Sequence, residues 1–227
     1  MIYPNLEALI DDTAADVAAA IRDAQRSGDG RARVVLTGGT AGIALLRRLR
    51  TEAIDWANVD VFFGDERNVP VDHPESNEGQ AREALLDHVD IHGYGLDGGP
   101  MDAAVARYEA ALAEFAPDGF DLHLLGMGGE GHINSLFPHT SAVREHDAMV
   151  VTVTDSPKPP AERATLTLPA VQSADRVWLL VSGAEKAEAA SHAGDGVTAA
   201  QDWPVAGAVG RKETVLRITE DAAGPLN

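Results

Sequence analysis

The chain alternates between short, densely apolar runs and longer stretches in which apolar residues recur every three or four positions. The short runs predict strands buried on both faces, and the longer stretches predict amphipathic helices. Predicted strands cover residues 32–36, 59–63, 120–125, 148–153, 177–181 and 214–218. Predicted helices cover residues 6–24, 43–50, 78–88, 103–115 and 184–193, and a short helix is expected at Ser135–Leu136, ended by Pro138.

Strands that alternate with helices predict an α/β fold, here a Rossmann-like, mostly parallel sheet with helices on both faces. The chain has no internal repeat and no low-complexity segment. We interpret the Gly-rich stretch at residues 90–102 as a surface loop rather than a domain linker. Residues 1–227 are therefore expected to form a single domain.

The composition narrows the class of protein. The chain has 227 residues, 44% of them hydrophobic, and no cysteine, which excludes disulfides, a thiol nucleophile and a Cys-ligated zinc site. The N-terminus lacks the basic and apolar regions of a signal peptide, and no apolar run approaches the roughly 20 residues that span a bilayer. We expect a cytoplasmic protein that does not associate with membranes.

The formal net charge of −18 limits the kinds of partner that the chain is expected to bind. It repels nucleic acid and anionic membrane surfaces, so neither is expected to bind. It also opposes the binding of any small anion. An anionic substrate would therefore need a local cluster of basic residues in its site.

The first loop with candidate chemistry is Thr37-Gly38-Gly39-Thr40-Ala41-Gly42, between a predicted strand and a predicted helix. Backbone N–H groups and the helix dipole favour an anion there, which makes Gly38, Gly39 and Thr40 candidate phosphate contacts. The loop is neither a P-loop nor a G-x-G-x-x-G dinucleotide fingerprint. A tight strand-to-helix turn explains the same residues, and the motif alone does not separate the two readings.

The second loop, Gly64-Asp65-Glu66-Arg67, follows the next predicted strand. The planar, permanently charged guanidinium of Arg67 suits phosphate, and Asp65 is suited to contact sugar hydroxyls or to orient Arg67. In isolation, a solvated turn with an internal ion pair is the simpler interpretation. The position at the carboxyl end of a strand favours a functional role.

The third loop has four glycines within residues 126–131 and carries Glu130 and His132. An acid two residues before an imidazole can orient the ring and raise its basicity, as general-base activation of water requires. A metal site is the competing interpretation, but the eight histidines form no helical ligand pair. Neither Ser135 nor Ser141 lies in G-x-S-x-G, so a serine-hydrolase nucleophile is not supported.

A fourth segment, residues 156–163, holds three prolines together with Lys158 and Arg163. Prolines stiffen the chain and lower the ordering cost of binding, so the two cations are candidates for an anion clamp. The alternative is a rigid surface turn whose cations offset nearby acids.

These four segments, in this order, resemble the 6-phosphogluconolactonases, within the larger group that includes glucosamine-6-phosphate deaminases. The resemblance extends over about residues 34–190, and the matching stretches are GGTAG, GDERNVPVDHPESN, FDLHLLGMGGEGHINSLFP and SPKPPAERATLTLPA. The resemblance implies a Rossmann-like fold and hydrolysis of 6-phospho-D-glucono-1,5-lactone to 6-phosphogluconate in the oxidative pentose phosphate pathway. It implies no metal and no organic cofactor, and we expect a monomer whose partner is the phosphorylated sugar lactone.

The resemblance also implies roles for individual residues. His132 would be the general base, and we expect Glu130 to orient its ring and stabilise its cation. Asp65 stays a candidate for contacts with the sugar. The positions implied for phosphate binding are Gly38, Gly39, Thr40, Arg67, Lys158 and Arg163.

The chain departs from the family pattern at several positions, and these departures bear on which alternative functions have to be considered. Glu130 stands where family members commonly have aspartate, and Ile133 is shared with the deaminases. The deaminases, however, place a glutamate where this chain has Phe137 and a tyrosine where it has Arg67. The remaining alternatives are a glucosamine-6-phosphate deaminase or sugar-phosphate isomerase, and a non-catalytic sugar-phosphate sensor.

Overall fold

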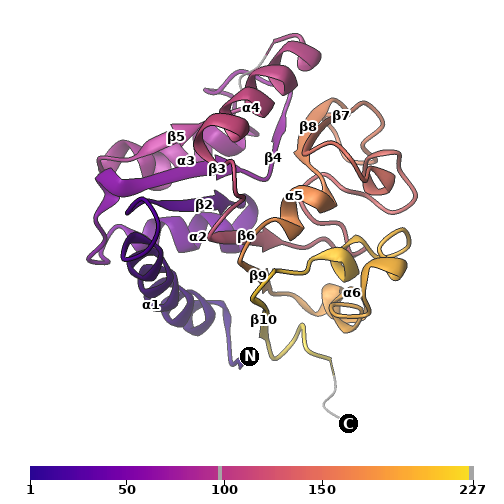
Figure 1. Ribbon diagram of the computed structural model, residues 1–227. Coiled ribbons are helices and arrows are strands. Elements are labelled where there is room, and N and C mark those ends of the chain that lie inside the picture. Colours follow the sequence, from indigo (N-terminus) through magenta and orange to yellow (C-terminus); the bar gives the residue numbers. More distant parts are fainter. Residues whose placement is uncertain (97–98, 225–227) are drawn as a thin grey trace.

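A parallel sheet of seven strands forms the centre of the structure, a computed structural model that describes residues 1–96 and 99–224 (Figure 1). All the strand pairs in this sheet are parallel, which confirms the predicted fold class. In spatial order the strands are β1 (Ile2–Tyr3), β10 (Glu213–Thr219), β9 (Arg176–Val181), β6 (Leu122–Gly126), β2 (Ala32–Leu36), β3 (Val59–Phe63) and β5 (His92–Tyr94).

The strand order reverses between β2 and β6. From β2 the chain moves outward to β3 and β5, whereas from β6 it moves the other way, to β9 and β10. The loops that leave β2 and β6 therefore diverge and open a crevice at the carboxyl ends of these strands. In open α/β sheets this reversal is the point at which ligands bind.

Helices cover both faces of the sheet (Figure 1). α1 (Leu6–Gln25), α2 (Gly39–Leu49) and α3 (Asn77–Ala84) share one hydrophobic cluster with the strands. α4 (Met101–Phe115), α5 (Leu168–Gln172) and α6 (Ala187–Ser191) share the other. Single-turn 3₁₀ helices occupy Trp56–Asn58, Leu86–His88, Ala142–Arg144, Ala184–Lys186, Val197–Ala199 and Pro204–Gly207.

The alternation of side chains along each strand divides the core between these two clusters. On β2, Val34 belongs to the α1/α2 side and Val35 to the α4/α5 side, and Phe63 and Phe62 on β3 divide in the same way. Both faces are apolar, and for this reason the strands appear in the sequence as continuous hydrophobic runs.

A second, antiparallel sheet lies beyond the carboxyl ends of the main strands. It consists of β4 (Asp65–Arg67), β8 (Arg163–Leu166) and β7 (Val150–Val153), in that order. Residues 65–67, expected to be a loop, form a short strand whose partner lies almost a hundred residues later. In the register of this pair, Arg67 stands opposite Arg163.

Two local predictions were wrong. Ser135 and Leu136 are not helical: Ile133 and Leu136 form an isolated bridge, and Asn134 has a φ of 48°, which is incompatible with a right-handed helix. The stretch 90–102 was predicted as a loop, but it contains edge strand β5 and the start of α4. Residues 97 and 98 of that predicted loop lie outside the described residues.

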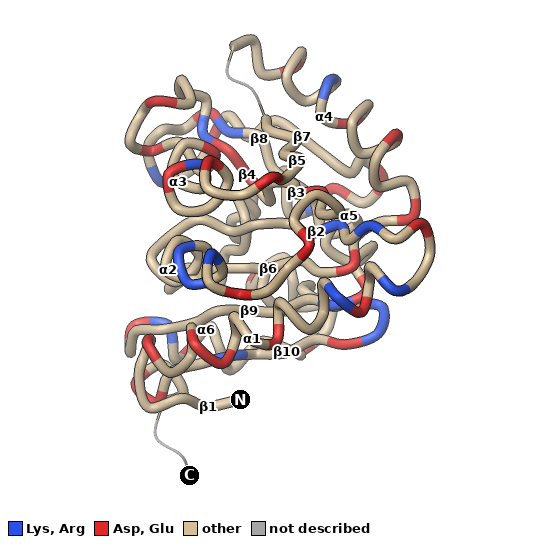
Figure 2. The backbone as a smooth tube through the Cα atoms, turned by 90° about the vertical axis from the view of Figure 1, so that its left-hand side faces the viewer, with Lys and Arg blue, Asp and Glu red and all other residues tan. Residues whose placement is uncertain are grey.

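Acidic residues are spread over helices and loops throughout the view in Figure 2. They outnumber basic residues by 36 to 18 in the whole chain. Among the described residues, none of the helices combines the length and the hydropathy that crossing a bilayer demands.

One hydrogen-bonded side chain fixes the end of β3, the strand that leads to β4. The fully buried Tyr108 of α4 donates its hydroxyl proton to the carbonyl oxygen of Phe63 at 2.8 Å. The same hydroxyl oxygen accepts from the Phe63 N–H at 2.7 Å. The backbone of Phe63 has thus both of its polar groups satisfied by a side chain from the neighbouring layer.

We predict that Tyr108→Phe lowers the free energy of unfolding by about 1–3 kcal/mol, because both groups of Phe63 then stay buried without a partner. Urea denaturation would measure the change. Tyr94→Phe is the matched control, since its hydroxyl makes a single 3.4 Å contact with Asp60 and is only partly buried. Equal stability of the two variants would contradict this role of Tyr108.

Candidate active site

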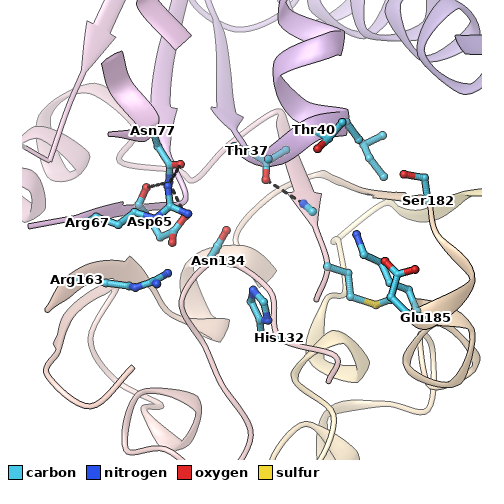
Figure 3. Close-up of a pocket in the computed structure, with 17 residues that line it drawn as sticks. Thr37, Thr40, Asp65, Arg67, Asn77, His132, Asn134, Arg163, Ser182 and Glu185 are labelled. Carbon is cyan, nitrogen blue, oxygen red and sulfur yellow. Dashed lines mark hydrogen bonds between the residues drawn. The ribbon is translucent and has the colours of Figure 1, made fainter. Parts of the chain in front are cut away.

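The crevice at the carboxyl ends of β2 and β6 is a cleft of about 330 Å³. It collects side chains from both sheets and from the loop after β9, as Figure 3 shows. The described residues that line it are Thr37, Gly38, Gly39, Thr40, Ala41, Asp65, Arg67, Asn77, Gly126, Met127, His132, Asn134, Arg163, Leu180, Ser182, Glu185 and Lys186.

The glycine loop after β2 forms one wall. Gly38 is the N-cap of α2, and a Cβ atom there would lie 2.4 Å from Oδ1 of Asn77, so this position requires glycine. Thr37 Oγ1 accepts from the N–H of Gly126 at 2.9 Å and so links the loops after β2 and β6 (Figure 3). The N-terminus of α2, with Gly39 and Thr40, faces the cleft and favours an anion.

The expected pair Asp65 and Arg67 is joined through a third residue. Nη1 of Arg67 donates to Oδ1 of Asn77 and to the carbonyl oxygen of Glu75, both at 2.8 Å. Nδ2 of Asn77 donates to the carbonyl and to Oδ1 of Asp65 at 2.8 and 3.0 Å. Asp65 therefore orients Arg67 indirectly, and Asn77 is the residue that connects them.

Glu66 lies between these residues in the sequence but points into the protein. Its carboxylate accepts from the backbone N–H groups of Arg67, Asn77 and Glu78, each at 2.8 Å, and from Ser76 Oγ at 2.9 Å. Burial raises the pKa of Glu66, and these donors oppose that effect. Glu66 thus attaches the start of α3 to β4 and fixes the position of Asn77.

Arg163 enters the cleft from β8, opposite Arg67. Its guanidinium donates through Nε to the carbonyl oxygen of Pro160 at 3.0 Å and through Nη1 to Ser135 Oγ at 3.3 Å. Ser135 in turn donates to Oδ2 of Asp65 at 2.5 Å. Ser135, dismissed as a nucleophile, is a buried structural contact between these charged groups. Burial lowers the pKa of Arg163, as expected for a desolvated cation.

Glu130 and His132 lie in a tight turn after β6. The N–H of Gly128 donates to the carbonyl of His132 at 2.9 Å, and Gly131, at φ 78°, donates to the carbonyl of Gly128 at 3.1 Å. A Cβ atom on Gly128 would lie 2.0 Å from Nδ1 of His132, so the turn brings the ring onto its own backbone. This contact explains why the loop needs glycine there.

The imidazole of His132 is held on one nitrogen. Oε1 of Glu130 lies 3.0 Å from Nδ1 and 2.8 Å from Nζ of Lys158, and the ring of Phe137 packs with its centroid 4.5 Å from that of His132. Within the described part of the chain, Nε2 has no hydrogen-bond partner, and the ring lines the cleft. A carboxylate on Nδ1 selects the tautomer whose Nε2 accepts a proton.

The protonation states suit a general base. Burial lowers the pKa of His132 below its ordinary 6.5, the charge of Lys158 lowers it further, and Glu130 and Asp65 act in the opposite direction. Burial raises the pKa of Glu130, but the hydrogen bond from Lys158 and the nearby positive charges outweigh it, and the net shift is downward. These shifts favour the carboxylate form of Glu130 and the neutral form of the His132 imidazole.

The cleft brings together most of the residues expected from sequence. Gly38, Gly39, Thr40, Asp65, Arg67, His132 and Arg163 all line it. Glu130 and Lys158 lie outside the set of described lining residues and contact His132 instead. Among the described residues, no three His, Cys, Asp or Glu side chains are grouped as metal ligands.

Five polar residues of the cleft had no role predicted from the sequence: Asn77, Asn134, Ser182, Glu185 and Lys186. Three of them directly follow β9, so the rule that ligands bind beyond the carboxyl ends of strands would have found them. Lys186 has no ion-pair partner among the described residues, which leaves its charge available to a ligand. Asn134 reaches the cleft through its left-handed backbone, which the sequence did not reveal.

Comparison with known proteins confirms the resemblance. The profile of the family described as glucosamine-6-phosphate isomerases/6-phosphogluconolactonase matches residues 4–216. A 6-phosphogluconolactonase of Mycobacterium leprae is 52% identical over 86% of this chain and 85% of its own. One of Mycobacterium tuberculosis is 49% identical over 99% of this chain and 97% of its own.

The crystal structure of the 6-phosphogluconolactonase of Thermotoga maritima superposes with a TM-score of 0.87 at 25% identity, covering 97% of this chain and 98% of that one. Its fold, the lactonase relatives and the family profile agree over nearly the whole chain. The chain belongs to the glucosamine-6-phosphate isomerase/6-phosphogluconolactonase family.

Proposed function

We propose that this chain hydrolyses 6-phospho-D-glucono-1,5-lactone to 6-phosphogluconate, as an enzyme of the oxidative pentose phosphate pathway. The observation that carries the proposal is the imidazole of His132, held through Nδ1 by Glu130, in a cleft that also holds three cations. The lactonase relatives support the same reaction.

The cations of the cleft and the N-terminus of α2 form the proposed binding site for the phosphate group of the substrate. Arg67, Arg163 and Lys186 line the cleft together with the N–H groups of Gly38 and Gly39 and the hydroxyl of Thr40. These groups supply the local positive charge that a protein of net charge −18 needs in order to bind a phosphorylated sugar. Phosphate binding is remote from the reacting carbon, so its binding energy can position the ring.

His132 carries the chemistry. Nε2 takes a proton from water, and the water oxygen attacks the carbonyl carbon of the lactone. The tetrahedral intermediate then collapses with cleavage of the bond between that carbon and the ring oxygen, and His132 returns the proton to the departing oxygen. Glu130 keeps the ring oriented and stabilises its cation, and backbone N–H groups of a glycine loop meet the negative oxygen.

Deamination of an aminosugar phosphate is the second candidate, because a solved glucosamine-6-phosphate deaminase shares the fold at 25% identity with a TM-score of 0.81. Phe137 argues against it. It occupies the position of the glutamate expected in a deaminase, and its buried ring packs on His132, so no acid stands there to transfer a proton. A lactonase needs no such acid.

We also propose the domain organisation, the oligomeric state and the location of the enzyme. The described residues that line the cleft extend from Thr37 to Lys186 of one fold. The chain is proposed to act as a single catalytic domain and as a monomer. The absence of cysteine suits the reducing cytoplasm.

We predict that His132→Ala lowers kcat for lactone hydrolysis by roughly 10²–10⁴-fold, with a much smaller change in KM, because the general base is lost and the phosphate contacts remain. The assay follows acid release, corrected for spontaneous hydrolysis. The exposed His146→Ala is the control and should keep wild-type turnover. Turnover of His132→Ala within about threefold of wild type, or release of ammonia from glucosamine 6-phosphate by the wild type, would contradict the proposal.

Lys186→Met should raise KM by roughly 10- to 100-fold and weaken inhibition by inorganic phosphate in parallel, since one charged hydrogen bond to phosphate is lost. Steady-state kinetics with phosphate as competitor measures both. The control is Lys212→Met, which removes an exposed lysine paired with Asp175 and should change neither value. A loss of kcat alone would show that Lys186 does not hold the phosphate.

The imidazole of His132 should titrate below pH 6.5, because burial and Lys158 disfavour its protonated form. The base is therefore active above this midpoint and lost as the pH falls through it. An NMR titration of the ring proton resonances, with the His132 signal identified by its absence from His132→Ala, measures the midpoint. A midpoint above 6.5 would mean that Glu130 and Asp65 dominate instead.

A further inference from the structure

Lys158 contacts the catalytic turn rather than the cleft. Its ammonium lies 2.8 Å from Oε1 and 3.2 Å from Oε2 of Glu130, and 3.5 Å from Nδ1 of His132. The same Oε1 of Glu130 lies 3.0 Å from that Nδ1. Lys158, Glu130 and His132 therefore form a chain of contacts, of which only the imidazole lines the cleft among the described residues.

The backbone of Lys158 is held on several sides. Ser156 Oγ donates to the carbonyl oxygen of Lys158 at 2.9 Å and accepts from its N–H at 3.3 Å. Nη2 of Arg163 donates to the same carbonyl at 2.8 Å. The side chain then extends beside Phe137, with Nζ 6.0 Å from the centroid of the ring that packs on His132. These contacts place the ammonium beside Glu130.

These contacts argue against a phosphate-binding role for Lys158. To reach a ligand in the cleft, its Nζ would have to leave both oxygens of Glu130, and the carboxylate would lose its partner. The cleft already holds Arg67, Arg163 and Lys186 among its lining residues. The phosphate has sufficient cations without Lys158.

We propose that Lys158 is a positioning residue of the reaction, which holds the carboxylate of Glu130 against Nδ1 of His132 and keeps the imidazole in its unprotonated, proton-accepting form. This inference rests on the proposed lactone hydrolysis, in which His132 is the base. Lys158 itself touches neither the water nor the lactone.

The charges that face His132 determine in which direction its pKa changes when Lys158 is removed. Lys158 lowers the pKa of His132 and Glu130 and Asp65 raise it, while Arg163 lies across Phe137, 5.6 Å from the centre of that ring. Removing Lys158 leaves the two carboxylates unopposed nearby, so the pKa of His132 must rise.

The test compares full-length wild type, Lys158→Met and Lys158→Arg, with Lys212→Met as a remote lysine control. Kinetic constants for the lactone, inhibition by inorganic phosphate and the NMR midpoint of His132 are measured from about pH 5 to about pH 9. Methionine keeps the length of the side chain without its charge. Because Lys158 is 48% exposed, this variant leaves no deeply buried charge unpaired and should fold.

For Lys158→Met we expect the midpoint of His132 to move to higher pH and kcat to fall several-fold at the acid end, with recovery toward the alkaline end. KM and phosphate inhibition should stay within about twofold of wild type, and Lys158→Arg should restore the wild-type profile. A uniform rise of KM with weaker phosphate inhibition and an unmoved midpoint would make Lys158 a phosphate ligand and overturn the proposal.

An unmoved midpoint with unchanged kinetics would overturn the proposal as well. The NMR midpoint does not depend on the substrate. If the wild type does not hydrolyse the lactone, the proposed function fails, and the midpoint still decides whether Lys158 controls His132.

Discussion

The antiparallel pairing of β4 with β8 is the constraint on which the site depends. It places Arg67 opposite Arg163 and brings the proline-rich segment before β8 against the loop after β6. Ser135 of that loop donates from its N–H to Thr165 Oγ1 and from its hydroxyl to Asp65, so both strands hold the loop that carries His132. Without this small sheet, the two arginines and His132 would belong to separate loops.

The site meets two electrostatic requirements: it must attract an anion, and it must keep a base unprotonated. The chain as a whole is strongly acidic, yet the cleft gathers cations and a helix terminus where an anion must bind. The base, in contrast, must stay unprotonated beside the carboxylate of Glu130. Burial and the ammonium of Lys158 offset the effect of that carboxylate on the pKa of His132.

Glycine has a packing role at the centre of this arrangement. Gly128 lets the backbone approach the imidazole, and Gly38 leaves room for the amide of Asn77, which connects Asp65 to Arg67. Gly64 does the same for Asn134, whose Oδ1 would lie 2.2 Å from a Cβ atom there. Each glycine thus allows a polar side chain to come close to a neighbouring loop, which a larger residue would prevent.

By itself, the sequence determined the alternation of strands and helices, the parallel sheet and the loops that carry Gly38, Arg67 and His132. Hydrophobic periodicity and glycine placement are local properties, and the carboxyl ends of parallel strands meet at one edge of the sheet. The family resemblance added the reaction that these residues suggest.

Only the tertiary structure decided how the loops meet. Residues 65–67 form a strand because of a partner near residue 165, and no local pattern in three polar residues predicts such a pairing. The position of Lys158 on Glu130, the link through Asn77 and the left-handed backbone of Asn134 likewise arise from contacts between distant segments. Long-range packing sets these distances, and the roles proposed for the cations and for His132 rest on them.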